Sequence, residues 1–399
     1  MLNNILIVAA GWHDEVAGGG NKLPTDFARY LTDKGKEVQY LCASPFVKGW
    51  DAQNKNGVRV WRYEQPRFKS PSIRNLFSHL FRSWLLSRKI ARQGKIEVVL
   101  GHSPLQYLGA ILGLKGAVKR CYGVHSPFVE ELKANQEDAR TFKQMLSFEI
   151  AEKIEKAIYR KSNIIHSDSF YTLSVLKEQY PRVLKNKGRV LQGWVDTEKF
   201  IPSRIGASRE RLTLGKPWDP NIPAFFTLRR LVPRMGLDIL IEAVHLLRGF
   251  PFSFKVMIGG EGPEEARLKE RVVRYGLNQR VFLLGKIPEE KLISSFRAAD
   301  CFVLPTRTLE CFGLIILESY ACGIPVIGMP VGSIPEVMGE KFSNWLASEN
   351  TAEALAQKMR DFLVGNLEAN SMELSQRALE FSFSHLAPFH EEVLLHHVA

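Results

Sequence analysis

The chain has 399 residues, which is enough for two ordinary domains with large cores. Hydrophobic residues make up 45% and charged residues 24%, a composition typical of a soluble globular protein, with no low-complexity run and no internal repeat. The formal net charge is +12, so basic residues outnumber acidic ones, and where they cluster indicates candidate anionic partners.

The first residues, MLNNILIVAAGWHDE, lack the basic region of a signal peptide and predict a buried strand. No apolar stretch of about 18 residues or more is free of charge, so no membrane-spanning helix is predicted. Five scattered cysteines without a CxxC pair predict reduced thiols in a cytoplasmic protein, and neither a disulfide framework nor a zinc site.

Short apolar strands alternate with helical patterns in two blocks. The strands predicted in the first block are Ile5–Ala10, Glu37–Cys42, Val58–Trp61, Glu97–Gly101, Arg120–Val124, Asn163–His166 and Arg189–Leu191. Those predicted in the second block are Ala224–Leu228, Phe254–Ile258, Val281–Leu284, Cys301–Leu304, Val326–Ile327 and, on a weaker pattern, Ser343–Leu346.

This alternation predicts an α/β protein with two doubly wound, Rossmann-like domains whose parallel sheets are covered on both faces. Residues 201–221, rich in proline, glycine and charge, predict a linker between the blocks. We expect the first domain at residues 1–200, the second at 201–375 and a C-terminal helix at 376–399. Ligands are expected outside the carboxyl ends of the strands, in a cleft between the domains.

Three consecutive glycines follow the first strand and open the next helix: Gly18, Gly19 and Gly20. A glycine run lets the backbone approach a ligand closely and presents N–H groups to an anion. It differs from the GxGxxG fingerprint and has no acidic ribose ligand about 20 residues on, so a nicotinamide site is not expected.

The segment from Arg67 to Lys95 is basic throughout, with eight Lys or Arg and no acidic residue. Apolar residues recur in it at helical spacing: Ile73, Leu76, Phe77, Leu80, Phe81, Trp84 and Leu85. Such a helix fits the surface of an anionic membrane, and it equally fits an ordinary core-facing helix whose polar side is basic. Nucleic acid is the weakest of the three interpretations, because no dedicated binding module is present.

His125 follows a predicted strand within the sequence VHSPF, and His102 follows an earlier strand in the same way. At the carboxyl end of a parallel strand, a histidine either makes a structural hydrogen bond or contacts a ligand. Both interpretations stay open for His125, and His102 is the weaker candidate for contact with a ligand.

An arginine-rich loop follows the first strand of the second domain and contains Arg229, Arg230 and Arg234. Arginines at the carboxyl end of a strand suit a diphosphate, which they grip bidentately. The next strand runs into a glycine loop, VMIGGEGPEE, which contains Gly260 and precedes a helix. Each loop alone is compatible with a purely structural role, but together they line one edge of one sheet.

Glu310 and Glu318 stand eight residues apart in a predicted strand-loop-helix-strand unit, with Glu310 in the loop and Glu318 about two turns into a helix of roughly ten residues. The helix start, Phe312-Gly313-Leu314, offers free N–H groups and a dipole that favour a phosphate. Two acidic groups around an anion pocket suit a nucleotide sugar, which has hydroxyls on both sides of its phosphates. On spacing alone, two solvated glutamates remain the simpler interpretation.

Almost the whole chain resembles a family 4 retaining glycosyltransferase of the GT-B fold. The most specific segment is AADCFVLPTRTLECFGLIILESYACGIPVI, which contains both glutamates. GWVDTEKF and RRLVPRMGLDILIEA are moderately specific, and the glycine run and VHSPF are less so. The resemblance implies two Rossmann-like domains facing a central cleft, with the last helix returning to the N-terminal domain.

The resemblance also implies a role for each matched residue. Glu318 would hold the ribose hydroxyls, and Glu310, with the N–H groups of the helix start, would bind the hydroxyls and phosphate of the donor sugar. Arg230 would stabilise the leaving diphosphate, and Gly18–Gly20 would close on it from the other domain. His125 matches a family histidine near the donor sugar and the reacting centre. Trp12, His13 and Asp14, just after the first strand, are expected to line the acceptor side.

Two positions depart from the family pattern. Met235 stands where the family usually carries a lysine, and Arg234 beside it is expected to supply the missing charge. Asn21 replaces an acidic residue that is common after the glycines, so acceptor contacts are not carried over to it. Gly260, in its own glycine loop, is assigned to the donor site.

The expected reaction moves a hexose from a UDP- or GDP-linked donor to an acceptor hydroxyl with retention. No DxD motif is present, so no metal ion is expected to clamp the diphosphate, and no cofactor is predicted. The expected acceptor is a glycan or glycolipid, as in surface polysaccharide assembly, and peripheral contact with the inner face of a membrane fits the basic segment. Two alternatives stay open: a sugar-nucleotide epimerase or hydrolase of the same fold, and a non-catalytic partner subunit.

Overall fold

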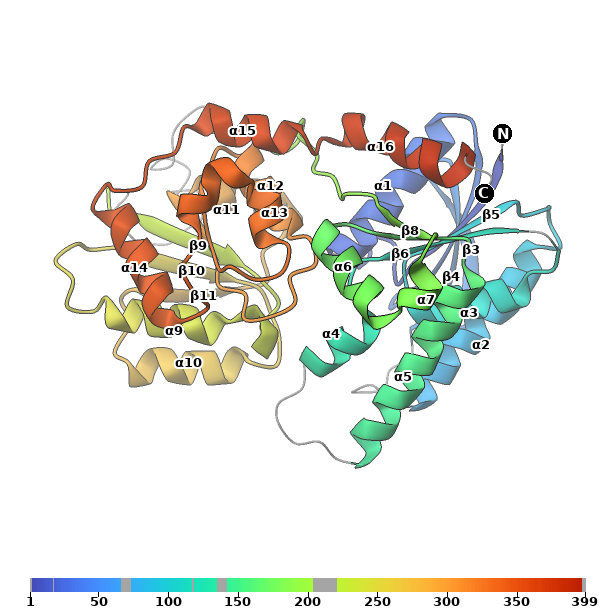
Figure 1. Cartoon of the computed structure of the whole chain (residues 1–399), viewed down its shortest axis with the longest axis horizontal. Helices are drawn as coiled ribbons and strands as arrows, with labels where there is room; N and C mark the ends of the chain where they lie inside the picture. The colour runs from blue at the N-terminus through green and yellow to red at the C-terminus, as the bar shows by residue number, and fades with distance from the viewer. Residues whose placement is uncertain are drawn as a thin grey trace. The chain divides into compact units, whose positions relative to one another are not determined.

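The computed structural model describes residues 2–16, 18–65, 73–116, 118–134, 142–203 and 221–396, with the backbone alone at 73–76 and 142–147. The chain forms two compact units (Figure 1). Unit 1 comprises Met1–Lys133, Ala139–Gly193 and Ser384–Ala399, and unit 2 comprises Ala134–Asp138 and Trp194–Phe383. Most of the predicted linker, residues 204–220, lies outside the described residues.

Unit 1 is built on a sheet with the strand order β3-β4-β2-β1-β5-β6-β7-β8. Its strands are β1 (Asn4–Val8), β2 (Glu37–Ser44), β3 (Trp50–Lys55), β4 (Val58–Glu64), β5 (Val98–Gly101), β6 (Lys119–Val124), β7 (Ile164–Ser167) and β8 (Gly188–Val190). All neighbours pair in parallel except β3, which is antiparallel to β4. Every strand predicted in the first block is confirmed within a few residues, and β3 is additional.

The helices of unit 1 are α1 (Gly19–Asp33), α2 (Ile73–Ile90), α3 (Pro104–Gly113), α4 (Phe128–Ala134), α5 (Phe142–Lys161), α6 (Phe170–Gln179), α7 (Pro181–Leu184), α16 (Phe383–Glu391) and the π-helical turn η3 (Glu392–His396). The predicted return of the C-terminal helix is visible in its contacts within unit 1. The Tyr30 hydroxyl donates to Glu391 at 2.9 Å, and His390 Nε2 lies 2.9 Å from the Gln192 carbonyl oxygen.

Unit 2 is built on a fully parallel sheet with the order β11-β10-β9-β12-β13. Its strands are β9 (Ala224–Leu228), β10 (Lys255–Gly259), β11 (Val281–Gly285), β12 (Cys301–Leu304) and β13 (Val326–Gly328). Its helices are η1 (Pro233–Met235), α9 (Leu237–Leu246), α10 (Glu265–Arg274), α11 (Glu289–Arg297), α12 (Leu314–Ala321), α13 (Ile334–Met338), η2 (Glu340–Trp345), α14 (Ala352–Leu363) and α15 (Ser371–Leu379).

The strand predicted at Ser343–Leu346 is wrong. Most of this segment belongs to the 3₁₀ helix η2, and only Leu346 makes a bridge, to Gly328. Phe342 and Trp345 are both buried and lie three residues apart, a spacing that puts them on the same side of a 3₁₀ helix but on opposite faces of a strand.

Aromatic packing fills the core of unit 2, where the rings of Phe226, Phe296 and Phe302 lie 5.5–5.7 Å apart. All five cysteines are buried and free. In the described part of the chain, no helix is both long and apolar enough to cross a bilayer.

Each sheet has one place where the chain order reverses. In unit 1 this switch point lies between β1 and β5, and in unit 2 it lies between β9 and β12. Doubly wound sheets bind ligands outside the carboxyl ends of the strands at such a point. The two sheets therefore confirm the predicted fold class and mark where a site in each unit is expected.

Candidate functional site

In unit 2, Glu310 lies in the loop after β12 and is bonded to Arg229, which directly follows β9. Arg229 Nη2 donates to Glu310 Oε2, and the same oxygen accepts a hydrogen bond from Thr306 Oγ1 at 3.0 Å. Arg229 and Glu310 are both buried, at 9% and 8% exposure. The structure thus joins Glu310 at the switch point to an arginine for which the sequence suggested no individual role.

Arg230, the arginine singled out from the sequence, is exposed at the same strand end. Across the described residues, no hydrogen bond or ion pair holds its side chain. Arg234 is half-buried, and its Nη1 donates to the Leu309 carbonyl oxygen at 3.0 Å. Arg230 is therefore accessible to an incoming anion, whereas Arg234 braces the loop that carries Glu310.

Met235, at the position of the expected lysine, is buried and lies with its Sδ 2.8 Å from Arg229 Nη2. A lysine here would bring a second positive charge against the buried guanidinium, at a large desolvation cost. The charge next to Glu310 comes from Arg229 in this chain. That Arg234 supplies the missing lysine's charge to a diphosphate stays a prediction, with its Nη1 on the Leu309 carbonyl oxygen in this structure.

The loops at this edge of the sheet pack backbone against backbone. A Cβ on Gly260, whose φ is +124°, would lie 1.8 Å from the Arg229 carbonyl oxygen. Leu309, immediately before Glu310, has a φ of +58°, a left-handed conformation that is costly for a side chain branched beyond Cβ. Gly260 is thus required by close packing on Arg229, and the backbone beside Glu310 is strained.

The helix α12 begins at Leu314, directly after Glu310 and its loop. Its N-cap is Gly313, with a φ of +78° and no side chain to cap the first N–H groups, and such helix starts favour anions. Phe312 is 4% exposed and its ring packs on Phe381, so its side chain belongs to the core. The helix has eight residues, and Glu318 is half-buried little more than one turn into it, not two.

In unit 1, the glycine run opens α1 as predicted, with Gly18 as the N-cap at a φ of +135° and no side-chain cap. Asn21 is buried behind it. Its Oδ1 accepts from Gly11 N at 3.0 Å and its Nδ2 donates to the Val16 carbonyl oxygen at 2.9 Å. Asn21 therefore braces the loop before the glycines.

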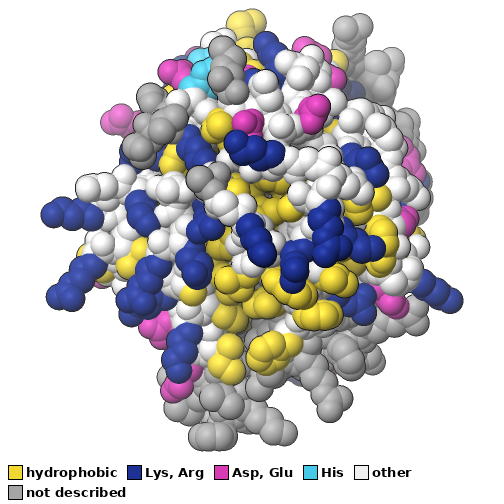
Figure 2. All heavy atoms as spheres, turned by 90° about the vertical axis from the view of Figure 1, so that its right-hand side faces the viewer, with side chains coloured by type: hydrophobic (Ala, Val, Ile, Leu, Met, Phe, Trp, Pro, Cys, Tyr) yellow, Lys and Arg dark blue, Asp and Glu magenta, His cyan; other side chains and the backbone are white. Residues whose placement is uncertain are grey.

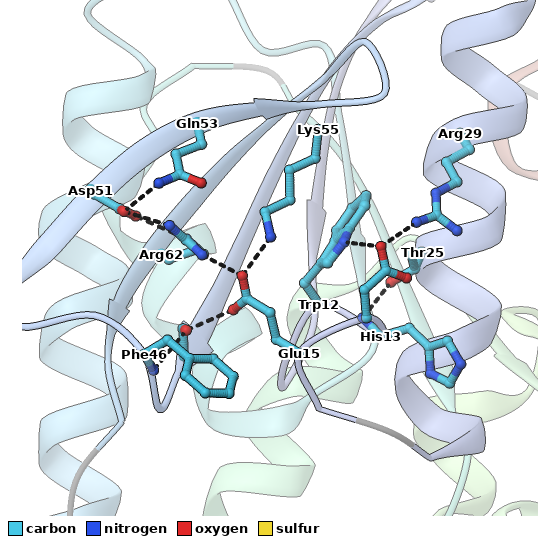
Figure 3. Close-up of polar contacts among 12 residues, drawn as sticks. Trp12, His13, Glu15, Thr25, Arg29, Phe46, Asp51, Gln53, Lys55 and Arg62 are labelled. Carbon is cyan, nitrogen blue, oxygen red and sulfur yellow. Dashed lines mark hydrogen bonds and ion pairs between the residues drawn. The ribbon is translucent and has the colours of Figure 1, made fainter. Parts of the chain in front are cut away.

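The loop after β1 is held by two charged groups (Figure 3). Trp12 is fully buried, and its Nε1 donates to Asp14 Oδ2, which also pairs with Arg29 at 2.7 Å. Burial would raise the pKa of Asp14, but the hydrogen bond and charge of Arg29 outweigh it and lower that pKa. The prediction that Trp12 lines the acceptor side is wrong for its side chain, which belongs to the core.

Glu15, in the same loop, was not singled out from the sequence. Its carboxylate accepts hydrogen bonds from Ser44 and Lys55, each at 2.6 Å, and from Arg62 (Figure 3). The one available signal was Arg62 itself, a charged residue inside the apolar strand VRVWRYE. This cluster joins the loop before the glycine run to β2, β3 and β4.

His125 belongs to a cluster at the carboxyl ends of β5, β6 and β7, in which His125 and His102 are half-buried and His166 and Asp168 are buried. Its Nδ1 donates to Asp168 Oδ2 at 2.7 Å, and its Nε2 lies 2.9 Å from His102 Nδ1. Burial acts to lower the pKa of His125, but the Asp168 carboxylate outweighs it, so that pKa is raised. Burial lowers the pKa values of His102 and His166 well below the ordinary range.

Gly123, in β6, makes room for this cluster, because a Cβ there would lie 2.6 Å from His166 Cε1 and 3.1 Å from His102 Nδ1. Of the three histidines, only His125 is favoured to carry a second proton. The structure therefore brings His125 together with His102 and Asp168, and the role of Asp168 was missed from the sequence. Within the described ranges, no three His, Cys, Asp or Glu side chains are grouped to hold a metal ion.

Asp168→Asn is expected to lower the pKa of His125, because the carboxylate is what outweighs burial. In the unaltered protein, the imidazolium contributes stability that is complete below the ordinary histidine pKa and is lost as pH rises through the raised pKa. The variant should lose that proton at lower pH in an NMR titration. His79, whose pKa burial lowers to about 4, is the reference, and an unshifted His125 would contradict the pairing.

Two family models match the chain. One, described as Glycosyltransferase Family 4, matches residues 17–199, and one described as Glycosyl transferases group 1 matches residues 210–379. A GDP-mannose-dependent alpha-(1-6)-phosphatidylinositol monomannoside mannosyltransferase of Mycolicibacterium smegmatis is 31% identical over 46% of this chain and 49% of its own length. The chain thus spans about half the length of such curated relatives.

Solved structures share the fold along the whole chain. Sucrose-phosphate synthase from Thermosynechococcus elongatus superposes with a TM-score of 0.82 at 20% identity, covering 98% of both chains. Anabaena Alr3699/HepE in complex with UDP-glucose superposes with a TM-score of 0.75 at 16% identity, covering 98% of this chain and 99% of that chain. At such identities the likeness shows the fold alone, which is the GT-B fold of two Rossmann-like units.

Proposed function

Because the chain belongs to the group 1, family 4 glycosyltransferases, we propose that it transfers a hexose from a nucleotide sugar to an acceptor hydroxyl. The observation that carries the proposal is the arrangement of Glu310 in unit 2. A buried carboxylate, oriented by Arg229 and Thr306, stands at the switch point directly before the uncapped start of α12. Such an arrangement offers an acceptor of sugar hydroxyls beside donors for a phosphate.

The donor is assigned to the carboxyl edge of the unit 2 sheet. Glu310 binds hydroxyls of the donor sugar, the first N–H groups of α12 and the exposed Arg230 bind the diphosphate, and Glu318 holds the ribose. The backbone around Gly260 closes the edge of this site. A UDP- or GDP-linked hexose is proposed because one relative is named GDP-mannose-dependent and one structure of the fold is a complex with UDP-glucose.

Transfer is proposed to proceed with retention through an oxocarbenium-like transition state. The sequence has no DxD, so the charge of the leaving diphosphate is assigned to Arg230, helix N–H groups and the glycine run of unit 1. Each such contact commonly contributes on the order of 3–4 kcal/mol to the transition state. A trapped covalent sugar–Glu310 adduct would contradict the assignment of Glu310 to binding.

In unit 1, His125 is assigned to the reacting centre, near the donor sugar. Because Nδ1 of His125 is held by Asp168, Nε2 is the atom left for a sugar hydroxyl once His102 releases it. The proposed acceptor is a glycolipid or a surface polysaccharide. The name of the Mycolicibacterium relative, which specifies a phosphatidylinositol monomannoside, supports the first.

Arg230→Ala is expected to weaken binding of UDP or GDP and to lower turnover by about 10²-fold or more, with the fold intact, because the side chain is exposed. Isothermal titration with each nucleoside diphosphate measures the affinity, and release of the nucleotide measures turnover. Arg274→Ala, the same change at a side chain 67% exposed on α10, is the matched control.

Unchanged affinity and turnover in Arg230→Ala would remove this residue from the diphosphate site. Incubation of the unaltered protein with UDP-hexose and GDP-hexose, without acceptor, tests the reaction class. Rapid and complete hydrolysis or epimerisation of the donor would contradict a transferase, and failure to bind any nucleoside diphosphate would contradict the donor site itself.

A further inference from the structure

The helix α2 leaves a row of large apolar side chains in solvent. Phe77, Phe81 and Leu85 are 66%, 58% and 40% exposed, and they lie four residues apart, so they share one face of the helix. Figure 2 shows hydrophobic side chains gathered on one face of unit 1 with Lys and Arg around them. A contiguous apolar patch rimmed by charge marks an interaction surface.

The opposite face of α2 is an ordinary core face. Leu86 and Ile90 are buried, and a Cβ on Gly109 of α3 would lie 2.2 Å from the Leu80 carbonyl oxygen, so α2 and α3 are in close backbone contact. Packing against α3 therefore accounts for one side of the helix. It does not account for the exposed Phe77 and Phe81.

Cations are held beside the exposed aromatic rings. Lys89 Nζ lies 3.8 Å above the ring of Trp50, which is 46% exposed on β3, and the Arg88 guanidinium lies 4.9 Å from the Trp84 ring. The sequence from 67 to 95 contains no acidic residue. The patch thus joins β3 to α2 and carries charge of one sign along the helix.

A shallow pocket lies where α2 and α3 both end. Its lining includes three exposed cationic side chains, Arg92, Lys95 and Lys115, together with the apolar Ile96 and Leu114. Three cations around one concavity suit an anionic group such as a phosphate. The lining of the pocket begins at Ala91, directly after the last residue of α2.

We propose that this face of unit 1, which we call the α2 face and define by Trp50, Phe77, Phe81, Leu85 and the pocket, docks on a bilayer that contains anionic lipids. Aromatic and aliphatic side chains enter the interfacial region, while the cations meet lipid phosphates. We propose a membrane because the positive charge of the α2 face is complementary to anionic lipid headgroups. Exposed Phe and Leu side chains gain little from the phosphates of a nucleic acid, but they gain from burial among acyl chains.

Co-sedimentation of the full chain with vesicles tests the proposal. Binding is expected to vesicles that contain phosphatidylglycerol and not to vesicles of phosphatidylcholine alone, and it should weaken as salt is raised. Phe77→Ser with Phe81→Ser should lower the affinity roughly tenfold or more. The matched control combines Phe170→Ser with Phe389→Ser, on side chains 66% and 49% exposed elsewhere in unit 1.

The contribution of the cations around the pocket is tested by combining Arg92→Glu, Lys95→Glu and Lys115→Glu. This triple variant is again expected to lower the affinity for vesicles roughly tenfold or more. Its control is the same reversal at Lys177, Arg182 and Lys185, which are exposed on and beside α6 and α7. Vesicle binding unaffected by loss of the two phenylalanines, or lost equally in both controls, would overturn the proposal. No nucleotide sugar is present, so the outcome is independent of the proposed transferase activity.

Discussion

Replacing Glu310 with glutamine is expected to lower turnover by about 10²–10³-fold, while the protein without bound nucleotide sugar keeps its fold. The carboxylate is assigned to the hydroxyls of the donor sugar. An amide of the same size keeps one oxygen that accepts hydrogen bonds but puts an NH₂ group, which donates them, in place of the other oxygen. Release of nucleotide from the donor, measured with the acceptor saturating, gives the turnover. Turnover within a few-fold of the unaltered protein would remove Glu310 from the site.

The stability of the same variant needs its own measurement, because Glu310 is the buried counter-charge of Arg229. Glu310→Gln leaves that guanidinium buried without a carboxylate, which commonly costs about 3–5 kcal/mol. Adding Arg229→Gln removes the uncompensated charge, so the double variant is expected to regain stability in urea unfolding without regaining turnover. A double variant that recovers both would show that Glu310 acts only through folding.

The ion pair also has a consequence for the order of events at the site. Arg229 occupies one oxygen of Glu310 before any ligand arrives, and Thr306 occupies the same oxygen. The other carboxylate oxygen is therefore the one available to a sugar hydroxyl. Arg229 then acts as a positioning residue that fixes the direction in which Glu310 presents this oxygen.

The placement of Glu310, of the start of α12 and of the strand ends was predictable, because it depends on local patterns. An apolar strand, a loop and a helix closed by Gly323 are each visible over a few residues, and parallel sheets bring strand ends together. The partners of Glu310 and His125 were not predictable. Arg229 is 81 residues from Glu310 along the chain, and Asp168 is 43 from His125, so only the folded sheet makes them neighbours.

Strand β3 was not predicted from the sequence for a different reason. Its sequence, WDAQNK, is polar and lacks apolar alternation, because it lies at the edge of the sheet with mostly exposed or half-buried residues. The turn that follows it was the available signal. Asn56 and Gly57 have φ values of +51° and +81°, the conformation that Asn-Gly favours in a tight hairpin.

Glu15→Gln is expected to lower the free energy of unfolding of unit 1 by about 3–5 kcal/mol. The side chains of Glu15 and Arg62 are 8% and 7% exposed, so the variant leaves a buried guanidinium with Asp51 alone as its partner. Lys55 loses its carboxylate as well. Hydrogen–deuterium exchange of β2 and β4 under increasing urea follows unit 1 separately from unit 2.

The dependence of stability on pH tests the same prediction in a second way. Burial would raise the pKa of Glu15, but hydrogen bonds from Lys55, Ser44 and Arg62 outweigh it, so that pKa is lowered. The stabilisation is therefore complete above the ordinary carboxyl pKa and is lost as pH falls through the lowered one. Glu15→Gln should be destabilised most near neutral pH and should approach the unaltered protein in acid.

Asp51→Asn is the matched control for this cluster, because Asp51 also bonds Arg62 but its side chain is 33% exposed. Solvent screens that pair, so a loss of about 1 kcal/mol or less is expected. Equal losses in the two variants would mean that burial of Glu15 adds nothing. A large loss confined to Glu15→Gln would instead identify this carboxylate as the anchor that holds the loop before Gly18 against β2, β3 and β4.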